Sequence, residues 1–564
     1  MDWDAFYRGE CFDAWHELGA HRSGQGWRFL TYAPRAHGVS LMGDFSGWQE
    51  VPMQRLESGA FCLDWHDARE GQRYKYCIYG ENGRVEHCDP FGFGMEGGCS
   101  VLYTLDYPFS DGGWMAERDK AFHRPVNIYE LHLASWRKPA GNYAGYEGIA
   151  EELIGHLRTH GFNYVELMPL CEHSVDGSLG YLPTGLFAPS SRFGNGWGLK
   201  ELINRLHRAN IGVLLDVEFL HFAVDSYGLA SYDGLPLYEK SPEPGEWGGL
   251  VFDHGRGETR SLLCSCAQFW LQEYHFDGLR LDAVSRMIYF GGEACYGDNE
   301  EGRYFLRTLT EGLRWRCPSA MIIAEDSTPF WGTTAPCHEG GLGFDYKWDM
   351  GWTHDIWRYM LTGMDHRGEL REHFRYTIED AERRSGMMAL SHDMARPGLL
   401  WQLPGDWGQR IRQMRLLGLL LAVRPGKKLA FMGMEWAYDK GWDPNGELDW
   451  GLWNVPEYGA FDAYVCALAH FYLGEPALWQ EEGSAGWRWA DVWSDNPCVF
   501  GLVRIGWDRQ VLALLNFSGE EARVWVGERT EAVLFDSTGR AEAGRDENGL
   551  LSLPALSGRV LRMA

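Results

Sequence analysis

A chain of 564 residues is too long for one ordinary hydrophobic core and predicts two to four domains. Its formal net charge of −27, without any basic run, argues against nucleic-acid binding, which needs a positive surface to release counterions. The 27 tryptophans suit the flat faces of sugars as well as a packed core, and composition alone leaves both uses open.

The first part of the chain, to about residue 109, alternates short β-like runs with turn residues. Examples are residues 27–32 (Trp-Arg-Phe-Leu-Thr-Tyr) and 39–42 (Val-Ser-Leu-Met), the second followed by a Gly-Asp-Phe-Ser-Gly-Trp turn that ends at Trp48. This pattern is typical of a small β-sandwich. The last part, from about residue 479, has the same texture, for example at residues 511–515, and predicts a second β-sandwich.

Residues 110–478 alternate short apolar strands with helical segments, which predicts a central (β/α)8 TIM barrel between the two sandwiches. We therefore expect a multidomain α/β protein divided at 1–109, 110–478 and 479–564. The candidate barrel strands, of which the sixth is the weakest, are residues 128–131, 164–167, 213–216, 279–282, 321–324, 344–346, 389–391 and 429–432.

Acidic or histidine side chains follow several of these strands. In a (β/α)8 barrel the carboxyl ends of the strands build the active site, so this placement predicts an enzyme. Simple capping of strands is a reasonable explanation for one such ending, but a poor one for five.

The sequence also predicts a cytoplasmic protein. Residues 1–4 (Met-Asp-Trp-Asp) lack the basic and apolar regions of a signal peptide, and no uninterrupted apolar run is long enough to span a bilayer. The 13 cysteines are scattered without a Cys-x-x-Cys pair, which is typical of reduced thiols, and Cys264 with Cys266 makes no metal site. We expect neither a membrane nor a nucleic-acid partner.

Two strand ends carry residues suited to covalent catalysis. Arg280 and Asp282 are two apart on a predicted strand, so both side chains leave the same face. A guanidinium beside a carboxylate keeps it ionised, which suits a nucleophile, although an isolated Arg-x-Asp is more often a structural ion pair. Glu325 ends the strand at 321–324, where partial desolvation would raise its pKa and suit a general acid.

Two further strands end in His392 and Asp393, and in Asp216 with His221 nearby. Retaining glycosidases need two carboxylates, one that attacks the anomeric carbon and one that carries the proton. A third would stabilise the transition state. The arrangement fits glycosyl chemistry better than metal-dependent hydrolysis, so we expect that no metal and no organic cofactor takes part in the reaction.

Four short motifs carry a resemblance to glycoside hydrolase family 13, the α-amylase family. They are residues 216–221 (Asp-Val-Glu-Phe-Leu-His), 278–284 (Gly-Leu-Arg-Leu-Asp-Ala-Val), 323–326 (Ile-Ala-Glu-Asp) and 390–393 (Leu-Ser-His-Asp). All four occur in the family's order. The resemblance implies a (β/α)8 barrel that acts on α-glucans with retention of configuration.

Within that family the chain resembles the branching enzymes over nearly its whole length. The segments that carry this likeness are residues 128–137, 188–194, 344–352 and 446–450. The turn at residues 43–48 is similar to carbohydrate-binding module family 48. The resemblance implies transfer of a cleaved α-1,4 chain to a 6-hydroxyl, with a glycogen-like, amylose-like or amylopectin-like polymer as partner and a monomer favoured.

Carried over by position, the resemblance implies that Asp282 is the nucleophile, Glu325 the general acid/base and Asp393 the transition-state stabiliser. The residues that would bind or brace the sugar and the nucleophile are Tyr181, Asp216, His221, Arg280 and His392.

The chain departs from the family's pattern in three places that concern acceptor binding and chain length. One is the stretch from Tyr289 to Tyr304, which is shorter than usual and lacks the usual loop. Leu179 and Leu182 flank Tyr181 where a Trp and a Gln are usual, and residues 394–398 (Met-Ala-Arg-Pro-Gly) follow the last motif in place of the usual run. Two alternatives to a transferase therefore stay open: an α-glucan hydrolase, and a catalytically weak glucan-binding protein.

Overall fold

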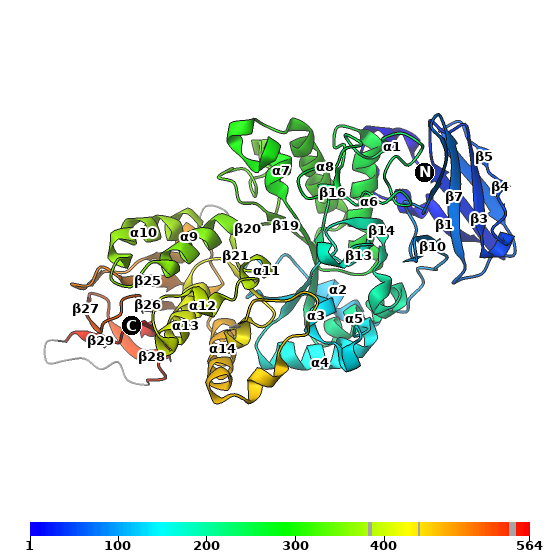
Figure 1. The fold of residues 1–564 in the computed structure, drawn as a ribbon. Helices are drawn as coiled ribbons and strands as arrows, with labels where there is room; N and C mark the ends of the chain where they lie inside the picture. Colours follow the sequence, from blue (N-terminus) through cyan, green and yellow to red (C-terminus); the bar gives the residue numbers. More distant parts are fainter. Residues whose placement is uncertain (382–385, 438–439, 541–548) are drawn as a thin grey trace.

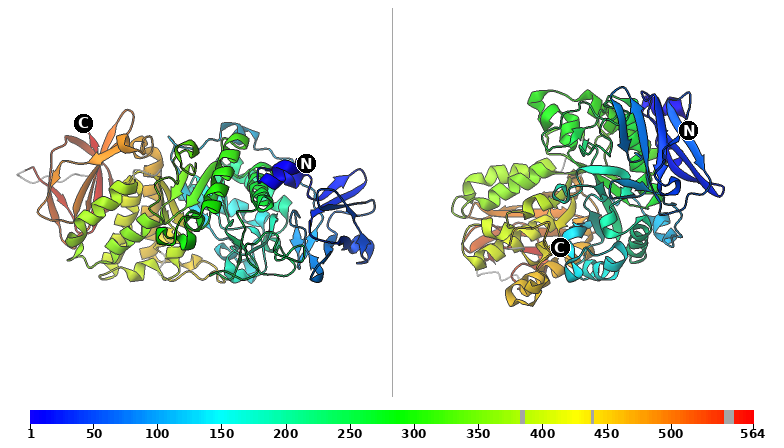
Figure 2. Two further views of the ribbon diagram at one scale, coloured as in Figure 1. Left: turned by 90° about the horizontal axis from the view of Figure 1, so that it is seen from above. Right: turned by 45° about the vertical axis from the view of Figure 1, so that its right-hand side comes forward.

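The computed structural model describes residues 1–381, 386–437, 440–540 and 549–564. Figure 1 shows three parts: N-terminal sheets on one side, a barrel with its helices in the middle, and C-terminal sheets on the other side. The two further views place the chain termini in the two outer parts (Figure 2). Among the residues described, none of the helices has both the length and the apolar character required to cross a bilayer.

A closed barrel of eight parallel strands forms the central part, which confirms the predicted fold. β11 pairs in parallel with both β12 and β22 and so closes the ring. The barrel strands in order are β11 (Asn127–Leu131), β12 (Tyr164–Leu167), β15 (Gly212–Val217), β18 (Gly278–Leu281), β19 (Met321–Glu325), β20 (Tyr346–Trp348), β21 (Gly386–Leu390) and β22 (Lys427–Phe431).

The sixth barrel strand begins two residues later than the sequence predicted. Asp345 precedes β20 and is already occupied, because its carboxylate accepts the backbone N–H of Ile322 at 2.9 Å and the ammonium of Lys120 at 2.6 Å. The side chain therefore fastens the start of β20 to β19 instead of extending the strand backwards.

Helices surround the barrel and bury apolar stripes against it. In α5 (Gly196–Arg208) the buried positions Leu199, Leu202, Ile203 and Leu206 recur every three to four residues, as a helix packed on one face requires. Asn195 caps this helix by accepting the backbone N–H of Gly198 at 3.0 Å. The other helices of six or more residues that follow β10 are α2 (Gly112–Glu117), α4 (Tyr146–Thr159), α6 (Gly257–Glu273), α8 (Glu300–Arg316), α9 (Met350–Leu361), α10 (Arg371–Ala381), α13 (Trp407–Val423) and α14 (Pro456–Gly474).

The N-terminal part is a two-sheet sandwich, as predicted. One sheet has the strand order β1-β2-β6-β5, and the other has β4-β3-β7-β10-β9 with β8 paired to β7. The strands are β1 (Gly19–Ser23), β2 (Gly26–Tyr32), β3 (Gly38–Gly43), β4 (Val51–Pro52), β5 (Gln54–Arg55), β6 (Ala60–Trp65), β7 (Arg73–Gly80), β8 (Gly83–His87), β9 (Met95–Glu96) and β10 (Cys99–Val101).

The C-terminal part also consists of two antiparallel sheets, with orders β23-β25-β26-β30-β28 and β24-β27-β29. The predicted run at 511–515 lies in its central strand, β26. The strands are β23 (Trp487–Trp489), β24 (Val492–Trp493), β25 (Val499–Ile505), β26 (Gln510–Asn516), β27 (Ala522–Val526), β28 (Thr530–Asp536), β29 (Leu551–Leu553) and β30 (Ser557–Met563).

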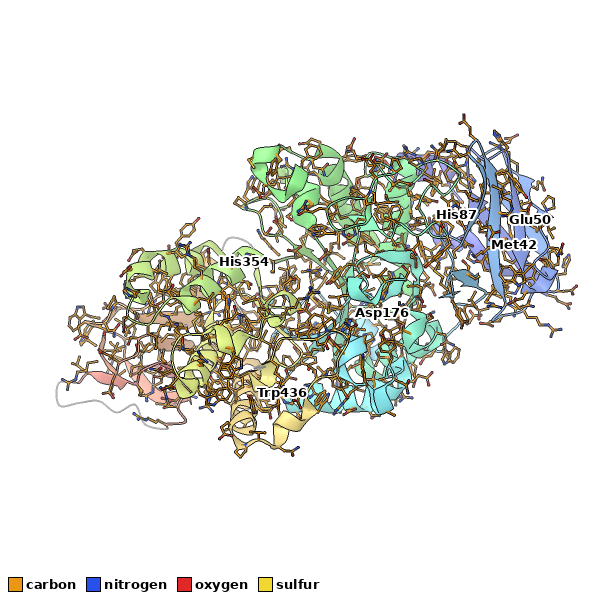
Figure 3. The ribbon with its side chains drawn as sticks, in the orientation of Figure 1. Met42, Glu50, His87, Asp176, His354 and Trp436 are labelled. Atoms are coloured by element: carbon orange, nitrogen blue, oxygen red, sulfur yellow. The ribbon has the colours of Figure 1, made fainter. Side chains whose placement is uncertain are left out.

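Polar contacts fix the N-terminal sandwich to the barrel. Arg35 donates from Nε to Asp233 Oδ2 at 3.0 Å and from Nη2 to Oδ1 at 2.6 Å, and its backbone N–H also reaches Oδ2 at 3.1 Å. The His87 ring bonds the Gly228 carbonyl at 2.8 Å. In Figure 3, His87 lies on the side of the sandwich that faces the barrel, whereas Glu50 lies farther out.

Trp48, in the turn between β3 and β4, makes its contacts inside the sandwich. Its indole N–H donates to Asp44 at 2.9 Å, and the Arg73 guanidinium lies 6.0 Å from the ring. Its φ of 61° is in the left-handed region, which is costly for a bulky side chain and is held here by these contacts. Trp48 thus stabilises its own turn.

We predict that Asp233→Ala lowers stability by about 2 kcal/mol, because three hydrogen bonds are lost and the Arg35 guanidinium loses its partner. Thermal unfolding of the whole chain measures the change. The matched control is Asp64→Ala, whose partner Arg28 is 3.8 Å away at an exposed site; that variant should change stability by less than about 0.5 kcal/mol. Equal effects of the two substitutions would contradict the role given to Asp233.

Candidate active site

The carboxyl ends of the barrel strands open into a cavity of about 630 Å³. Seven of the eight predicted site residues line it, whereas Asp216 lies behind them and is buried. The seven are Tyr181, His221, Arg280, Asp282, Glu325, His392 and Asp393. Tertiary folding thus brings together side chains that the sequence spreads over more than 200 positions.

The buried guanidinium of Arg280, on β18, connects two carboxylates. Its Nη1 donates to both carboxylate oxygens of Asp216 at 2.8 Å and to Asp282 Oδ1 at 2.5 Å. Its carbon Cζ lies 4.1 Å from the centre of the Trp348 ring. This cation–π contact with a buried barrel residue helps to hold the guanidinium in place. A permanent positive charge is therefore fixed against Asp282.

Asp216 also binds Tyr181, which lies at the edge of this network. The Tyr181 hydroxyl donates to Asp216 Oδ2 at 2.6 Å, and the Tyr181 ring stacks near His392 with centroids 5.9 Å apart. Burial raises the pKa of Asp216 to about 7 even though Arg280 opposes the shift. The flat face of Tyr181 is thus oriented at the cavity wall, where a sugar ring can stack.

Glu325 ends β19 and occupies a less polar environment than Asp282. Its Oε2 accepts the backbone N–H of Ala283 at 2.8 Å, and Ala283 adopts a left-handed φ of 49°, the strained position that directs this N–H. Burial, with a smaller contribution from the charges of Asp282 and Asp393, raises the pKa of Glu325 to about 8, although Arg280 opposes the shift. The carboxyl therefore keeps its proton at neutral pH.

His392 is held as a cation by Glu130, a residue whose part in the site the sequence reasoning missed. The ring Nδ1 lies 2.5 Å from Glu130 Oε1, and the His392 backbone N–H donates to Oε2 at 3.0 Å. Burial lowers the pKa of His392, but the Glu130 carboxylate more than offsets this and raises it to about 9. The other nitrogen, Nε2, lies 3.5 Å from Asp393 Oδ1. The sequence feature that could have pointed to Glu130 is an acidic residue within the apolar run that forms β11, whose five residues are all buried.

Glu218 is a second buried acid that the sequence reasoning did not assign. Its Oε1 accepts the backbone N–H groups of Leu220 at 2.5 Å and of His221 at 3.1 Å. Burial and then the charge of Asp282 raise the pKa of Glu218 well above its ordinary range. A protonated Glu218 thus fixes the segment that presents His221 and adds no second negative charge beside Asp282.

The rim of the cavity contains a half-exposed tryptophan that the sequence gave no reason to select. The Trp247 ring lies 5.5 Å from that of His221, and the Arg286 guanidinium lies over it at 4.4 Å. Glu246 pairs with Arg286 at 2.8 Å. Three residues from the segments that depart from the family's pattern also line the cavity, namely Leu179, Leu182 and Arg396.

Two carboxyl groups in one cavity therefore have opposite environments. Asp282 lies against a fixed cation, whereas Glu325 is desolvated and protonated. An ionised carboxylate beside a protonated carboxyl is the combination that acid-assisted cleavage of an acetal uses, in which one group attacks or assists while the other donates its proton to the leaving oxygen.

Known proteins share both the fold and a domain of this chain. Residues 17–92 match carbohydrate-binding module 48 (isoamylase N-terminal domain). A putative alpha amylase from Salmonella typhimurium is 18% identical over 97% of this chain and 100% of its own, with a TM-score of 0.74. A pullulanase from Anoxybacillus sp. LM18-11, solved with maltotetraose, is 16% identical over 99% of this chain and 89% of its own, with a TM-score of 0.76. The fold is thus an amylase-type barrel with an N-terminal carbohydrate-binding module.

Closer relatives identify the family. The 1,4-alpha-glucan branching enzyme GlgB of Bacillus subtilis (strain 168) is 36% identical over 89% of this chain and 84% of its own length. The enzyme of the same name from Desulfitobacterium hafniense (strain Y51) is 36% identical over 97% and 92% of the two chains. This chain belongs to the family of 1,4-alpha-glucan branching enzymes.

We predict that Glu325→Gln makes the stability of the protein less sensitive to a rise in pH between about 4.5 and 8. The folded chain holds a proton on Glu325 up to a pKa of about 8, whereas an ordinary glutamate releases it near 4.5. The folded state therefore binds more protons in this window, and the stability that Glu325 contributes falls as pH rises through it. Glutamine cannot ionise, so the variant should gain thermal stability relative to the wild type as pH rises from about 4.5 to 8.

The control is Glu293→Gln, at an exposed position on the same cavity. The difference between its melting temperature and that of the wild type should vary less with pH than the difference for Glu325→Gln, because the Glu293 side chain is exposed to solvent. A constant difference for Glu325→Gln would mean that Glu325 is ionised in the folded protein.

Proposed function

We propose that this protein cleaves α-1,4-glucosidic bonds and transfers the released chain to a 6-hydroxyl of an α-glucan, forming α-1,6 branches. The observation that carries the proposal is the pair Asp282 and Glu325, one carboxyl paired with Arg280 and the other protonated, within a chain that belongs to the branching-enzyme family. The substrates in this proposal are glycogen-like, amylose-like or amylopectin-like polymers.

The first half of the proposed reaction breaks the donor chain. The Asp282 carboxylate attacks the anomeric carbon, and the bond from that carbon to the glycosidic oxygen breaks as Glu325 donates its proton to the oxygen. A glucosyl ester of Asp282 forms, and the shortened donor leaves with a free 4-hydroxyl. In the second half, the ionised Glu325 takes the proton of an acceptor 6-hydroxyl. The acceptor oxygen then attacks the anomeric carbon and releases the Asp282 carboxylate.

The remaining predicted residues hold the charged transition state and the sugar. In this proposal Asp393 stabilises the oxocarbenium-like carbon and its neighbouring hydroxyls, and Arg280 keeps Asp282 aligned. Tyr181 offers its ring face to the sugar. His221 and His392 donate hydrogen bonds to its hydroxyls, and Asp216 braces Tyr181 and Arg280 from behind.

Transfer differs from hydrolysis in what reaches the glucosyl ester. Water competes with the acceptor, so a transferase must bind a second glucan at the cavity rim and exclude solvent. Trp247 with its Arg286 neighbour offers an apolar ring at that rim, and we assign it to glucan binding on this ground.

We further propose the domain division 1–109, 110–478 and 479–564, with the first part binding glucan. All 13 cysteines are free thiols in the structure. Cysteines stay reduced in a reducing compartment, so we propose a cytoplasmic location. A monomer is the proposed state.

Pure protein incubated with amylose should form α-1,6 linkages without a matching number of new reducing ends. Counting both in one reaction separates transfer from hydrolysis, because hydrolysis produces reducing ends alone. Asp282→Asn should lose at least about a thousandfold in turnover, since the covalent route is removed. Reducing ends without branches would contradict the proposed transfer, and near-native turnover of Asp282→Asn would contradict the nucleophile.

Trp48→Ala tests whether the sandwich binds glucan through this side chain. The Trp48 indole contacts Asp44 and Arg73, which belong to the same sandwich. We therefore expect Trp48→Ala to lower stability by about 1 kcal/mol. The KM values for amylose and for a short maltooligosaccharide should change equally. A rise in KM for amylose alone, at unchanged stability, would contradict this and make Trp48 a polymer-binding residue.

A further inference from the structure

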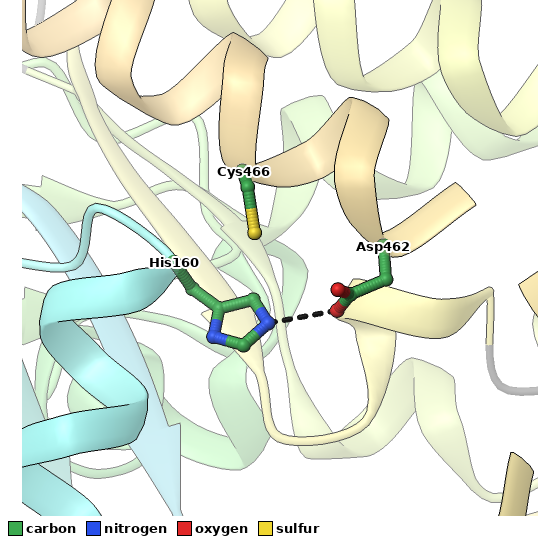
Figure 4. Close-up of side chains that lie close together, drawn as sticks. All are labelled: His160, Asp462 and Cys466. Atoms are coloured by element: carbon green, nitrogen blue, oxygen red, sulfur yellow. Dashed lines mark hydrogen bonds and ion pairs between the residues drawn. The ribbon is translucent and has the colours of Figure 1, made fainter. Parts of the chain in front are cut away.

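Three potential metal ligands meet between two helices outside the catalytic cavity. His160 follows the last residue of α4, and Asp462 and Cys466 lie on α14. His160 Nε2 is 2.7 Å from Asp462 Oδ1. A ring nitrogen of His160, a carboxylate oxygen of Asp462 and the Cys466 sulfur all lie within 4.8 Å of one another. In Figure 4 the Cys466 sulfur lies above the His160 ring and the Asp462 carboxylate lies beside it. His160 and Asp462 are buried, whereas Cys466 is half-buried.

The hydrogen bond on the far side of the imidazole prepares His160 for a metal. Its Nδ1 lies 2.9 Å from the backbone carbonyl of His156, which can only accept. Nδ1 must therefore carry the proton, and Nε2 directs its lone pair at the cluster once it is deprotonated. A carbonyl that holds the second nitrogen of a histidine ligand is a recurrent feature of metal sites because it fixes the tautomer and the ring orientation.

The spacing and the ligand types fit a tetrahedral ion. Asp462 and Cys466 are four residues apart, so a helix brings them to one face, one turn from each other. With bonds of about 2.0–2.3 Å, ligand atoms of a zinc ion lie about 3.2–3.8 Å apart, a separation that small rotations of these side chains reach. An imidazole, a thiolate and a carboxylate together suit zinc better than magnesium or calcium, which prefer oxygen alone.

We propose that His160, Asp462 and Cys466 bind a divalent transition metal of the zinc class, with water as the fourth ligand. Binding displaces the proton from His160 Nε2 and that from the Cys466 thiol, so the affinity falls as pH decreases.

The position of the cluster gives the metal a structural role. α4 follows β11 and α14 follows β22, and these two strands pair with each other to close the barrel. A metal that joins α4 to α14 therefore fastens the helical layer where the first and last parts of the barrel meet. His160 also precedes β12 by four residues, towards the amino ends of the barrel strands, whereas the catalytic cavity lies at their carboxyl ends.

The competing arrangement contains no metal. His160 would then be an imidazolium that donates to Asp462; burial lowers the pKa of His160, but the hydrogen bond to Asp462 offsets this and raises it to about 11. Cys466 would be an ordinary thiol. Only the metal site requires the sulfur, so Cys466 separates the two arrangements.

The test uses the full chain, stripped with a chelator and titrated with zinc and, separately, with cobalt(II). We expect one zinc ion per chain by elemental analysis and a rise in melting temperature of at least about 3 °C at saturating zinc. Cobalt should give the near-ultraviolet thiolate-to-metal band and the visible bands of a tetrahedral site. Branching of amylose at room temperature should be equal with and without zinc, because the catalytic residues lie elsewhere.

Cys466→Ser is the informative variant, because its half-buried position tolerates an oxygen. It should lose the cobalt charge-transfer band and the zinc-dependent rise in melting temperature. Cys99→Ser, at a half-buried thiol of the N-terminal sandwich, and His470→Gln, one turn farther along α14, should keep both. Absence of stoichiometric zinc in the wild type, or a cobalt band that survives Cys466→Ser, would overturn the proposal in favour of the His160–Asp462 ion pair.

Discussion

The catalytic cavity depends on one buried positive charge. Removing the Arg280 guanidinium from water is costly, and the cost is offset only because Asp216 and Asp282 accept its hydrogen bonds and the Trp348 ring lies against it. Asp216 in turn fixes the Tyr181 hydroxyl. The positions of the proposed nucleophile and of the sugar-stacking ring therefore follow from a single ion network on neighbouring parallel strands.

Around this network, burial and charge place neighbouring groups in different protonation states. Glu325 and Glu218 keep their protons because they are desolvated near the negative charge of Asp282, whereas His392 is charged because Glu130 outweighs the effect of its burial. An acid, an anion and a cation thus coexist within one cavity at neutral pH. Such a separation is what a reaction with both a nucleophilic and an acid–base step requires.

In the proposed mechanism, the choice between transfer and hydrolysis depends on the residues at the rim of the cavity. The carboxylates at the floor serve either reaction. Trp247, Arg286 and Arg396 surround the opening, and both leucines that replace usual family residues, Leu179 and Leu182, line the wall. The Trp247 ring and the two arginines offer a glucan both a stacking face and hydrogen-bond donors at this opening.

The sequence by itself determined the approximate positions of the barrel strands and the pairing of Arg280 with Asp282 at the centre of the site. Apolar runs that end in acids located the barrel strands. The two-residue spacing of Arg280 and Asp282 predicted that both side chains leave the same side, because side chains alternate along a strand, although β18 itself ends one residue earlier, at Leu281. The start of β20 was misjudged, since the bonds of Asp345 to Ile322 and Lys120 come from distant segments. Only the tertiary structure decided the parts of Glu130, Glu218 and Trp247, and the meeting of His160 with Cys466. Their environments depend on burial and on charges far away in the chain, which local periodicity does not encode.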